Sequence, residues 1–415
     1  MRKTFALCLS ALVLVLVLAL GATAALAGVG RATADPGITD KEIVLGATTP
    51  LSGPYYSVSS VTIGANAYFK YVNANGGVNG RKIVFKYLDD QYESAKTVQL
   101  TRQLVEQDKV FAIFNTIGTD NNLAIRDYLS ANKVPQLFAA SGSTTLGRDA
   151  AQYPGAIGFQ PSYQAEGWVY GKYLARTRPG ARVAVLFQDD DYGKDLLNGL
   201  KRGLQRSKVK VIAAEPYATN SSDVQSQVAK LKASGADTFA IFAVGKFAIQ
   251  AYVYANKLGW RPKLVINNIV SSASNVMGIA SEGGTNKVVD ASISGVFLKD
   301  PTDPKWANDA AVKLYRQILK RYAPGANAND PYHVYGMAVA YTFVEALKKA
   351  GKSPTRDSLV KAVSSLNLTK NPFMIPGIFI KTGPGDHFPI EQMLLQRWQK
   401  NAWRSFGGLW GYRAS

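Results

Sequence analysis

The chain has 415 residues, of which 47% are apolar and 19% are charged, and this balance excludes intrinsic disorder over most of its length. Cys8 is the only cysteine, and His333 and His387 are the only histidines, which excludes a disulfide-stapled fold and a zinc site built from several His or Cys ligands. The net charge of +19 fits an anionic surface or ligand, but the basic residues are scattered without a long basic block, which argues against nucleic-acid binding.

The N-terminus predicts an export signal. Two basic residues precede an apolar run over residues 5–27, and small residues allow cleavage after Ala27 or Ala34. An uncleaved membrane anchor is the alternative, because an apolar run of this length could span a bilayer. The alanine-rich end favours cleavage, so we expect residues 1–34 to be a signal peptide. Its loss removes three basic residues and no acid, which leaves a charge of +16 on a mature chain from Asp35 without cysteine.

After the signal, short apolar strands alternate with helical patterns. The first series of strands is predicted at residues 43–47, 82–88, 110–114 and 134–139. Its helices are predicted at residues 62–75, 94–107 and 121–131, with Ser94 as an N-cap. The second series of strands is predicted at residues 182–187, 209–213, 238–244 and 263–266. Its helices are predicted at residues 163–176, 195–206, 223–233 and 247–258. Two such series favour two α/β lobes, each with a parallel sheet covered by helices.

The pattern changes after residue 288. A strand ends near Phe297, and turn residues at 300–304 indicate a loop. Helices are predicted at residues 306–321 and 332–350. The tail from Gly377 to Phe406 predicts β-strands joined by a turn.

Motifs of common enzyme sites are absent or misplaced. The chain has no G-x-S-x-G and no G-x-G-x-x-G after a strand. Gly351-Lys352-Ser353 resembles the end of a phosphate-binding loop, but the triplet follows a helix, and Ala346 stands where that motif has its first glycine. The acidic run at residues 189–191 lies between a strand and a helix, where acids cap the helix N-terminus, and we prefer this interpretation to a cation site. We therefore expect no catalytic residue, no metal and no cofactor.

Two strand-to-helix junctions predict a ligand pocket. Residues 114–120 and 139–145 carry Ser, Thr and Asn after neighbouring strands, and ligands of open α/β sheets bind outside the carboxyl ends of strands. Hydroxyls and free N–H groups at a helix start can hold an anion such as a carboxylate, although ordinary capping explains either segment alone. Tyr192 and the Tyr55-Tyr56 pair also follow strand ends, and they either face the cleft or pack in the core.

Four short motifs follow one another behind the export signal: Leu51–Pro54, Asn75–Arg81, Asp89–Asp90 and Asp191–Gly193. Together they resemble the periplasmic substrate-binding proteins of ABC transporters, of the branched-chain amino acid (Leu/Ile/Val-binding) type, over nearly all of the mature chain. The resemblance implies the type I periplasmic binding protein fold, in which two Rossmann-like α/β lobes are joined by three crossovers and the ligand lies in the cleft between the lobes.

The resemblance also implies where the lobes divide. Crossovers are expected near Gln160, Leu298 and Gly383. The N-terminal lobe is then formed by residues 35–160 with residues 299–383. The C-terminal lobe is formed by residues 161–298 with residues 384–415.

Binding residues are implied in the same way. The family holds the ligand carboxylate with hydroxyl and backbone groups of the first lobe, which match Thr119, Ser141 and Ser143. The aromatic residue of the second lobe matches Tyr192. Tyr56 and Tyr163 are further candidates for an apolar lining, together with Tyr55 and Phe247.

One position departs from the family pattern. Amino-acid binders pair the ligand ammonium with an acid, and Asn268 stands there in this chain. A tyrosine of the amino-acid binders also falls near Val244 or Gly245. An amide supplies no charge to a buried ammonium, so a carboxylate or amide ligand without the α-amino group, such as an aromatic acid, competes with a branched-chain or aliphatic amino acid.

The expected function is that of a receptor in the periplasm. It binds a small amino acid or organic acid, and it delivers this ligand to the permease and ATPase of an ABC importer, acting as a monomer without catalysis. A sensor of the same fold that signals to a regulator is one alternative. A periplasmic hydrolase is the other, against which the missing nucleophile motif argues.

Overall fold

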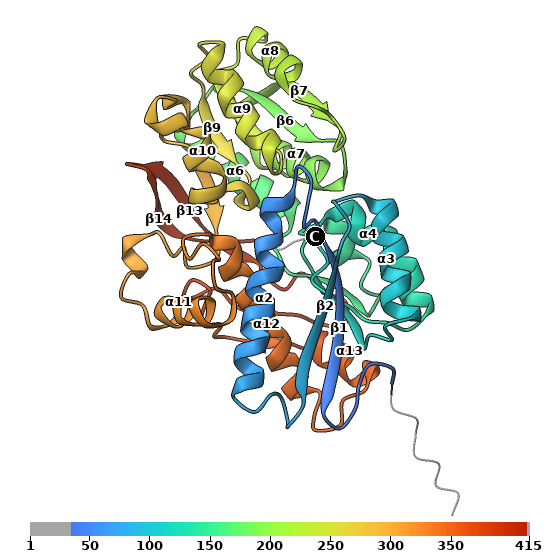
Figure 1. Ribbon diagram of the computed structural model, residues 1–415. Coiled ribbons are helices and arrows are strands. Elements are labelled where there is room, and N and C mark those ends of the chain that lie inside the picture. Colours follow the sequence, from blue (N-terminus) through green and yellow to red (C-terminus); the bar gives the residue numbers. More distant parts are fainter. Residues whose placement is uncertain (1–34, 413–415) are drawn as a thin grey trace, which may run out of the picture. The chain divides into compact units, whose positions relative to one another are not determined.

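The computed structural model describes residues 35–412, so the expected signal peptide, residues 1–34, lies outside the described part of the chain (Figure 1). One sheet has five strands in the order β2-β1-β3-β4-β5, and all of its neighbours are parallel. Its strands are β1 (Glu42–Thr49), β2 (Lys82–Asp89), β3 (Ala112–Phe114), β4 (Gln136–Ala139) and β5 (Ala156–Gly158). The carboxyl ends of these strands therefore meet at one edge, which is where parallel sheets bind ligands.

Helices cover this sheet on both faces. The first ones along the chain are α2 (Ser60–Ala74), α3 (Ser94–Glu106), α4 (Thr119–Ala131) and the short α5 (Thr144–Arg148). Leu104 of α3 and Ile125 and Leu129 of α4 share a separate apolar cluster with Ile113 of β3. On the other face, Phe69 of α2 packs in the main core with rings from β2, β3 and a later helix.

The second sheet has seven strands in the order β14-β13-β10-β9-β8-β6-β7. Its strands are β6 (Arg182–Gln188), β7 (Lys210–Tyr217), β8 (Thr238–Phe242), β9 (Lys263–Ile266), β10 (Ile293–Val296), β13 (Gln392–Gln399) and β14 (Ala402–Gly411). Strands β6 to β10 pair in parallel, whereas β13 is antiparallel to both β10 and β14. The helices that follow these parallel strands, or precede the first of them, are α6 (Tyr163–Thr177), α7 (Asp191–Leu204), α8 (Gln225–Ala233), α9 (Lys246–Lys257) and the single turn α10 (Gly278–Ala280).

Between β10 and β13 the chain leaves the second sheet. It forms α11 (Ala310–Tyr322), α12 (Pro331–Lys349), α13 (Arg356–Val363) and the two-stranded ladder of β11 (Asn367–Leu368) and β12 (Ile380–Lys381). Helices α11 and α12 pack on α2, which lies against the first sheet (Figure 1). The second sheet is thus completed by the distant strands β13 and β14, and the helices that pack beside the first sheet include the distant α11 and α12.

Close helix crossings depend on glycine. Gly64 of α2 and Gly336 of α12 bring the two helices into backbone contact, because a Cβ on Gly336 would lie 2.0 Å from the carbonyl oxygen of Val61. The same device joins α6 and α7, where a Cβ on Gly199 would lie 2.1 Å from the carbonyl oxygen of Gln164. Side chains of ordinary size would force either pair apart.

The α/β class and the strand–helix series predicted from the sequence are confirmed. The Ser94 cap is wrong: Ser94 is the first helical residue of α3, and Glu93 precedes it without a side-chain cap. Helix α7 begins at Asp191, four residues before its predicted start, because the Asp190 side chain accepts a hydrogen bond from the Gly193 N–H. This confirms the capping interpretation of the acidic run. Over residues 35–412, no helix combines the length and apolar character needed to cross a bilayer.

Candidate functional site

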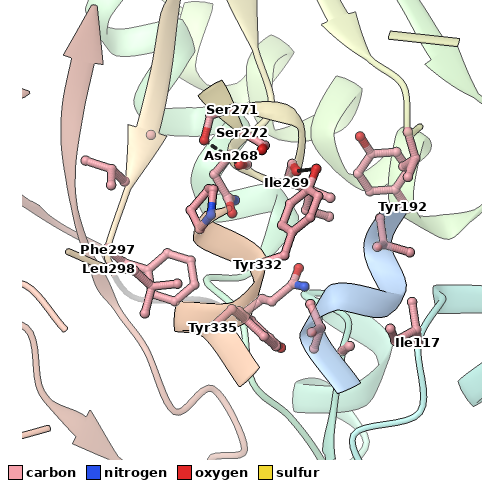
Figure 2. Close-up of a pocket in the computed structure, with 18 of the residues that line it drawn as sticks. Ile117, Tyr192, Asn268, Ile269, Ser271, Ser272, Phe297, Leu298, Tyr332 and Tyr335 are labelled. Atoms are coloured by element: carbon pink, nitrogen blue, oxygen red, sulfur yellow. Dashed lines mark hydrogen bonds between the residues drawn. The ribbon is translucent and has the colours of Figure 1, made fainter. Parts of the chain in front are cut away.

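A cavity lies where the carboxyl ends of strands from both sheets meet the start of α12. It holds about 930 Å³ of space free of protein atoms, including the part open to solvent. Its aromatic lining consists of Tyr92, Tyr163, Tyr192, Phe297, Tyr332 and Tyr335. Figure 2 shows the rings of Phe297, Tyr332 and Tyr335 below Asn268, with Tyr192 and Ile117 on the opposite side. A mainly apolar lining with a few polar groups is typical of sites for small ligands.

Four of the predicted site residues line this cavity: Thr119, Tyr163, Tyr192 and Asn268. Ser141 lies directly behind Thr119, since the hydroxyl oxygens of the two residues are 2.8 Å apart and Ser141 is fully buried. The structure thus brings five predicted residues together, from the ends of β3, β4, β6 and β9 and the start of α6. Whether they contact a ligand stays a prediction.

Two predicted residues lie elsewhere. The Ser143 hydroxyl caps α5, where it accepts a hydrogen bond from the Thr145 N–H at 3.3 Å, as the capping alternative expects. Tyr56 is 64% exposed and is outside the lining found within residues 35–412. Its neighbour Tyr55 is buried and stacks on Tyr92, with the ring centroids 4.1 Å apart. Tyr55 and the buried Phe247 thus support the wall of the cavity from behind.

The start of α4 presents an uncapped helix end to the cavity. Gly118 is the N-cap residue of α4 and has no side chain to satisfy the first N–H groups of the helix. Gly118 and Thr119 both line the cavity, and the Thr119 hydroxyl adds a second polar group there. A helix N-terminus with free N–H groups favours an anion. This end of the cavity is therefore suited to a carboxylate.

Three tyrosines of the cavity lining, Tyr163, Tyr192 and Tyr332, are fixed by contacts with neighbouring residues. The Tyr163 hydroxyl donates to Oε1 of Gln160 at 2.9 Å. The rings of Tyr163 and Tyr192 are nearly perpendicular, and their centroids are 5.0 Å apart. The Tyr332 hydroxyl donates to the carbonyl oxygen of Ile269 at 2.6 Å. That bond joins the start of α12 to the loop after β9.

Other hydrogen bonds join α5 to α7. The Thr144 N–H donates to Oδ2 of Asp195 at 2.8 Å, and the Thr145 hydroxyl donates to Oδ2 of Asp191 at 3.1 Å. Burial raises the pKa of the nearby Asp190 carboxyl to about 6. These hydrogen bonds connect helices that belong to different sheets.

A buried acid that the sequence analysis missed lies behind Asn268. Glu166 of α6 is fully buried, and its carboxylate accepts hydrogen bonds from Nδ2 of Asn267 at 2.6 Å, and from Nδ2 and the backbone N–H of Asn268 at 2.5 and 2.7 Å. The Tyr170 hydroxyl is a further donor. Burial raises the pKa of Glu166 to about 7, although the hydrogen bonds oppose this shift. The signal in the sequence was an acid at helical spacing among the buried residues Tyr163, Tyr170 and Leu174.

The charged groups of the cavity are few. Among the described residues that line it there is no Lys, Arg or His, and Asp300 is the single acid. Oδ1 of Asp300 accepts bonds from the N–H and hydroxyl of Thr302, each at 2.7 Å, and burial raises the pKa of this carboxyl. No cluster of three or more His, Cys, Asp or Glu side chains suited to a metal ion occurs within residues 35–412.

Comparisons with known proteins agree on the kind of protein. A family model described as periplasmic binding protein matches residues 42–402. Leu/Ile/Val-binding protein homolog 1 of Brucella abortus is 24% identical over 386 residues, which cover 87% of this chain and 91% of the homolog.

Solved structures share the fold. A branched-chain amino acid ABC transporter protein from Thermus thermophilus with bound valine has a TM-score of 0.79 at 15% identity, over 91% of this chain and 98% of that protein. A solute-binding protein of an ABC transporter from R. palustris in complex with benzoate has a TM-score of 0.74 at 15% identity, over 90% and 98% of the two chains. These likenesses confirm the expected type I fold with two lobes.

Proposed function

Because this chain belongs to the periplasmic binding protein family, we propose that it is an exported receptor that binds a small ligand and delivers it to the permease and ATPase of an ABC importer. The observation that carries the proposal is the tyrosine-lined cavity between the two sheets. The receptor would act in the periplasm as a monomer and without catalysis. The names of the similar proteins, which describe binding proteins, support this proposal.

We propose that the lobes divide as the family resemblance implies, with residues 35–160 and 299–383 in one and residues 161–298 and 384–415 in the other. The membership of β13 and β14 in the second sheet supports this division. The packing of α11 and α12 on α2 supports it too. Closure of the two lobes around a ligand would then give the permease a form of the receptor that differs from the open one.

The proposed ligand is a small molecule with a carboxylate or amide at one end and an apolar body. The Thr119–Ser141 hydroxyl pair and the free start of α4 would hold the polar end. The rings of Tyr163, Tyr192 and Tyr332 would cover the apolar body. Branched-chain or aliphatic amino acids and aromatic acids both meet this description.

A thermal-shift screen tests the ligand class. The panel pairs leucine with 4-methylpentanoate and phenylalanine with 3-phenylpropionate, and it adds benzoate and short amides. A ligand at a hundred times its Kd adds about 2.7 kcal/mol, which for a chain of about 380 residues raises Tm by about 3 °C. If no member of the panel shifts Tm, the proposed ligand class is wrong. Release of an altered product from a panel member would favour the hydrolase instead.

Transport is tested separately with proteoliposomes. A candidate ABC permease and its ATPase would be reconstituted, and uptake of the radiolabelled ligand would be measured with and without the receptor. Uptake that depends on the receptor supports delivery. A ligand that binds but is not taken up would favour a sensor of the same fold.

A further inference from the structure

Glu166 is a buried acid without a cationic partner in the described part of the chain. Its four hydrogen-bond donors, from Asn267, Asn268 and Tyr170, are all uncharged, and no ion pair within residues 35–412 involves it. Four donors and no acceptor suit the ionised form of the carboxyl. Buried charges are normally paired, so this carboxylate lacks the partner that its position calls for.

The donors of Glu166 fix the orientation of Asn268. Nδ2 of Asn268 is held at 2.5 Å from Oε2 of Glu166, and the backbone N–H of Asn268 donates to Oε1. Since the amide nitrogen faces Glu166, the amide oxygen is the atom left for the cavity that Asn268 lines. The protein therefore offers a hydrogen-bond acceptor at this point, with a negative charge directly behind it.

The Tyr170 hydroxyl strengthens this arrangement. It accepts a hydrogen bond from the Gly295 N–H at 2.8 Å, so its own proton is directed to Glu166. Gly295 belongs to β10 and lines the cavity as well. Glu166 thus joins α6, the loop after β9 and β10, and its position relative to the cavity is well defined.

We propose that Glu166, acting through Asn268, selects a ligand that carries a protonated amine. The inference rests on the proposed receptor function and deepens it: with the carboxylate end at Thr119, the ligand would be a zwitterion such as an α-amino acid. The absence of an acid at position 268 then does not argue against an amino-acid ligand, because the Glu166 carboxylate supplies the negative charge from behind Asn268.

The expected size of the effect follows from the distances. An ammonium bonded to Oδ1 of Asn268 would lie about 6–7 Å from the Glu166 carboxylate, where attraction at an effective dielectric constant of about 20 corresponds to about fiftyfold in Kd. We therefore expect Glu166→Gln to weaken leucine binding about fiftyfold. The binding of 4-methylpentanoate, which lacks the amine, should change less than about threefold.

A charge swap serves as the matched control. In Glu166→Gln/Asn268→Asp the amide and the carboxylate exchange places, so the introduced amide can donate to the introduced carboxylate and the negative charge returns. We expect this double variant to bind leucine within about fivefold of the parent. A merely structural role of Glu166 would not produce recovery by a second substitution.

The pH dependence of the unmodified protein gives a test without any variant. The titratable groups that interact with Glu166 are Tyr170, Tyr192 and Tyr412, and all three have pKa values well above their usual 10. Glu166 is therefore the group of this set that titrates near neutral pH. An ammonium favours the ionised carboxyl, so leucine should bind about tenfold more weakly at pH 6 than at pH 8. Binding of 4-methylpentanoate should stay within about threefold.

Isothermal titration calorimetry on the exported protein measures all of these constants. Equal losses for both ligands in Glu166→Gln, or a leucine affinity that is constant from pH 6 to pH 8, would overturn the inference. Tight binding of 4-methylpentanoate or 3-phenylpropionate without binding of leucine or phenylalanine would overturn the inference while leaving the receptor function intact. If no panel member binds, the proposed ligand class is wrong, and the inference about Glu166 is overturned with it. Asp190→Asn, which removes another carboxyl of raised pKa, should keep the pH dependence of leucine binding.

Discussion

Replacing Gly336 by alanine tests how α12 is held against α2. The added Cβ would lie 2.0 Å from the carbonyl oxygen of Val61 and 2.6 Å from the backbone nitrogen of Ala65. Both atoms belong to the α2 backbone, so no side chain can rotate away, and the helices must separate by about 1 Å. Overpacking of this kind lowers stability by about 1–3 kcal/mol or more. The higher helix propensity of alanine relative to glycine offsets about 1 kcal/mol of this loss. We expect a net loss of about 2 kcal/mol.

The loss is measured by urea unfolding followed by circular dichroism, which gives the free energy of unfolding. Gly408→Ala is the matched control, because the space around Gly408 within 4 Å is open, and its stability should change by less than about 0.5 kcal/mol. The Gly336→Ala variant should also bind ligand more weakly, since Val61 at the start of α2 and Tyr332 at the start of α12 both line the cavity. If Gly336→Ala is as stable as the parent, close backbone contact between α2 and α12 at Gly336 is not needed for stability.

Three further changes test single contacts. Thr119→Ala should weaken the binding of carboxylate ligands about ten- to a hundredfold, because it removes one hydrogen bond to a charged group. Tyr56→Ala at an exposed site should leave Kd unchanged, and calorimetry that finds the reverse order would contradict the assigned lining. Thr145→Val removes the bond to Asp191 that joins α5 to α7, so stopped-flow measurements should show ligand release several times faster. An unchanged rate would contradict a role of this bond in closure. Burial raises the pKa of Asp190 to about 6, so the folded state binds its proton more tightly than the unfolded state. Stability should therefore fall by about 2 kcal/mol between pH 4 and pH 7 on account of this group. Asp190→Asn should remove that part of the loss, and urea unfolding curves that fall equally in parent and variant would exclude it.

The strands and helices of both lobes were predictable because their apolar patterns are strong. The buried strands β6 and β8, for example, consist of continuous apolar runs between turns, and sequence alone placed them within two residues. Short elements were missed: α5 has five residues and α13 eight. Their apolar faces are too short for a period to be recognised.

Residues of the site could be predicted only where they directly follow a predicted strand. Thr119 and Tyr192 follow strands directly, and their position at the sheet edge follows from the strand pattern. Glu166 instead acts through a residue about a hundred positions away, Asn268. Tyr332 lines the cavity because α12 packs on α2, which is a long-range contact. No periodicity carries that kind of information, since it depends on how the chain returns to its first sheet.

The cavity is lined partly by the chain segments that connect the two sheets. Gln160 and Tyr163 lie where the chain passes from β5 to α6, and Leu298 and Asp300 lie where it leaves β10. Substitutions there would alter ligand fit and the bending of the connections together, so evolution could not tune one without disturbing the other. The loop from Asn268 to Ser272 is not one of these connections, and its bond to α12 is made by the backbone carbonyl of Ile269, which a change of side chain leaves in place. Changes of ligand among related receptors should therefore accumulate in that loop, while the connecting segments vary little.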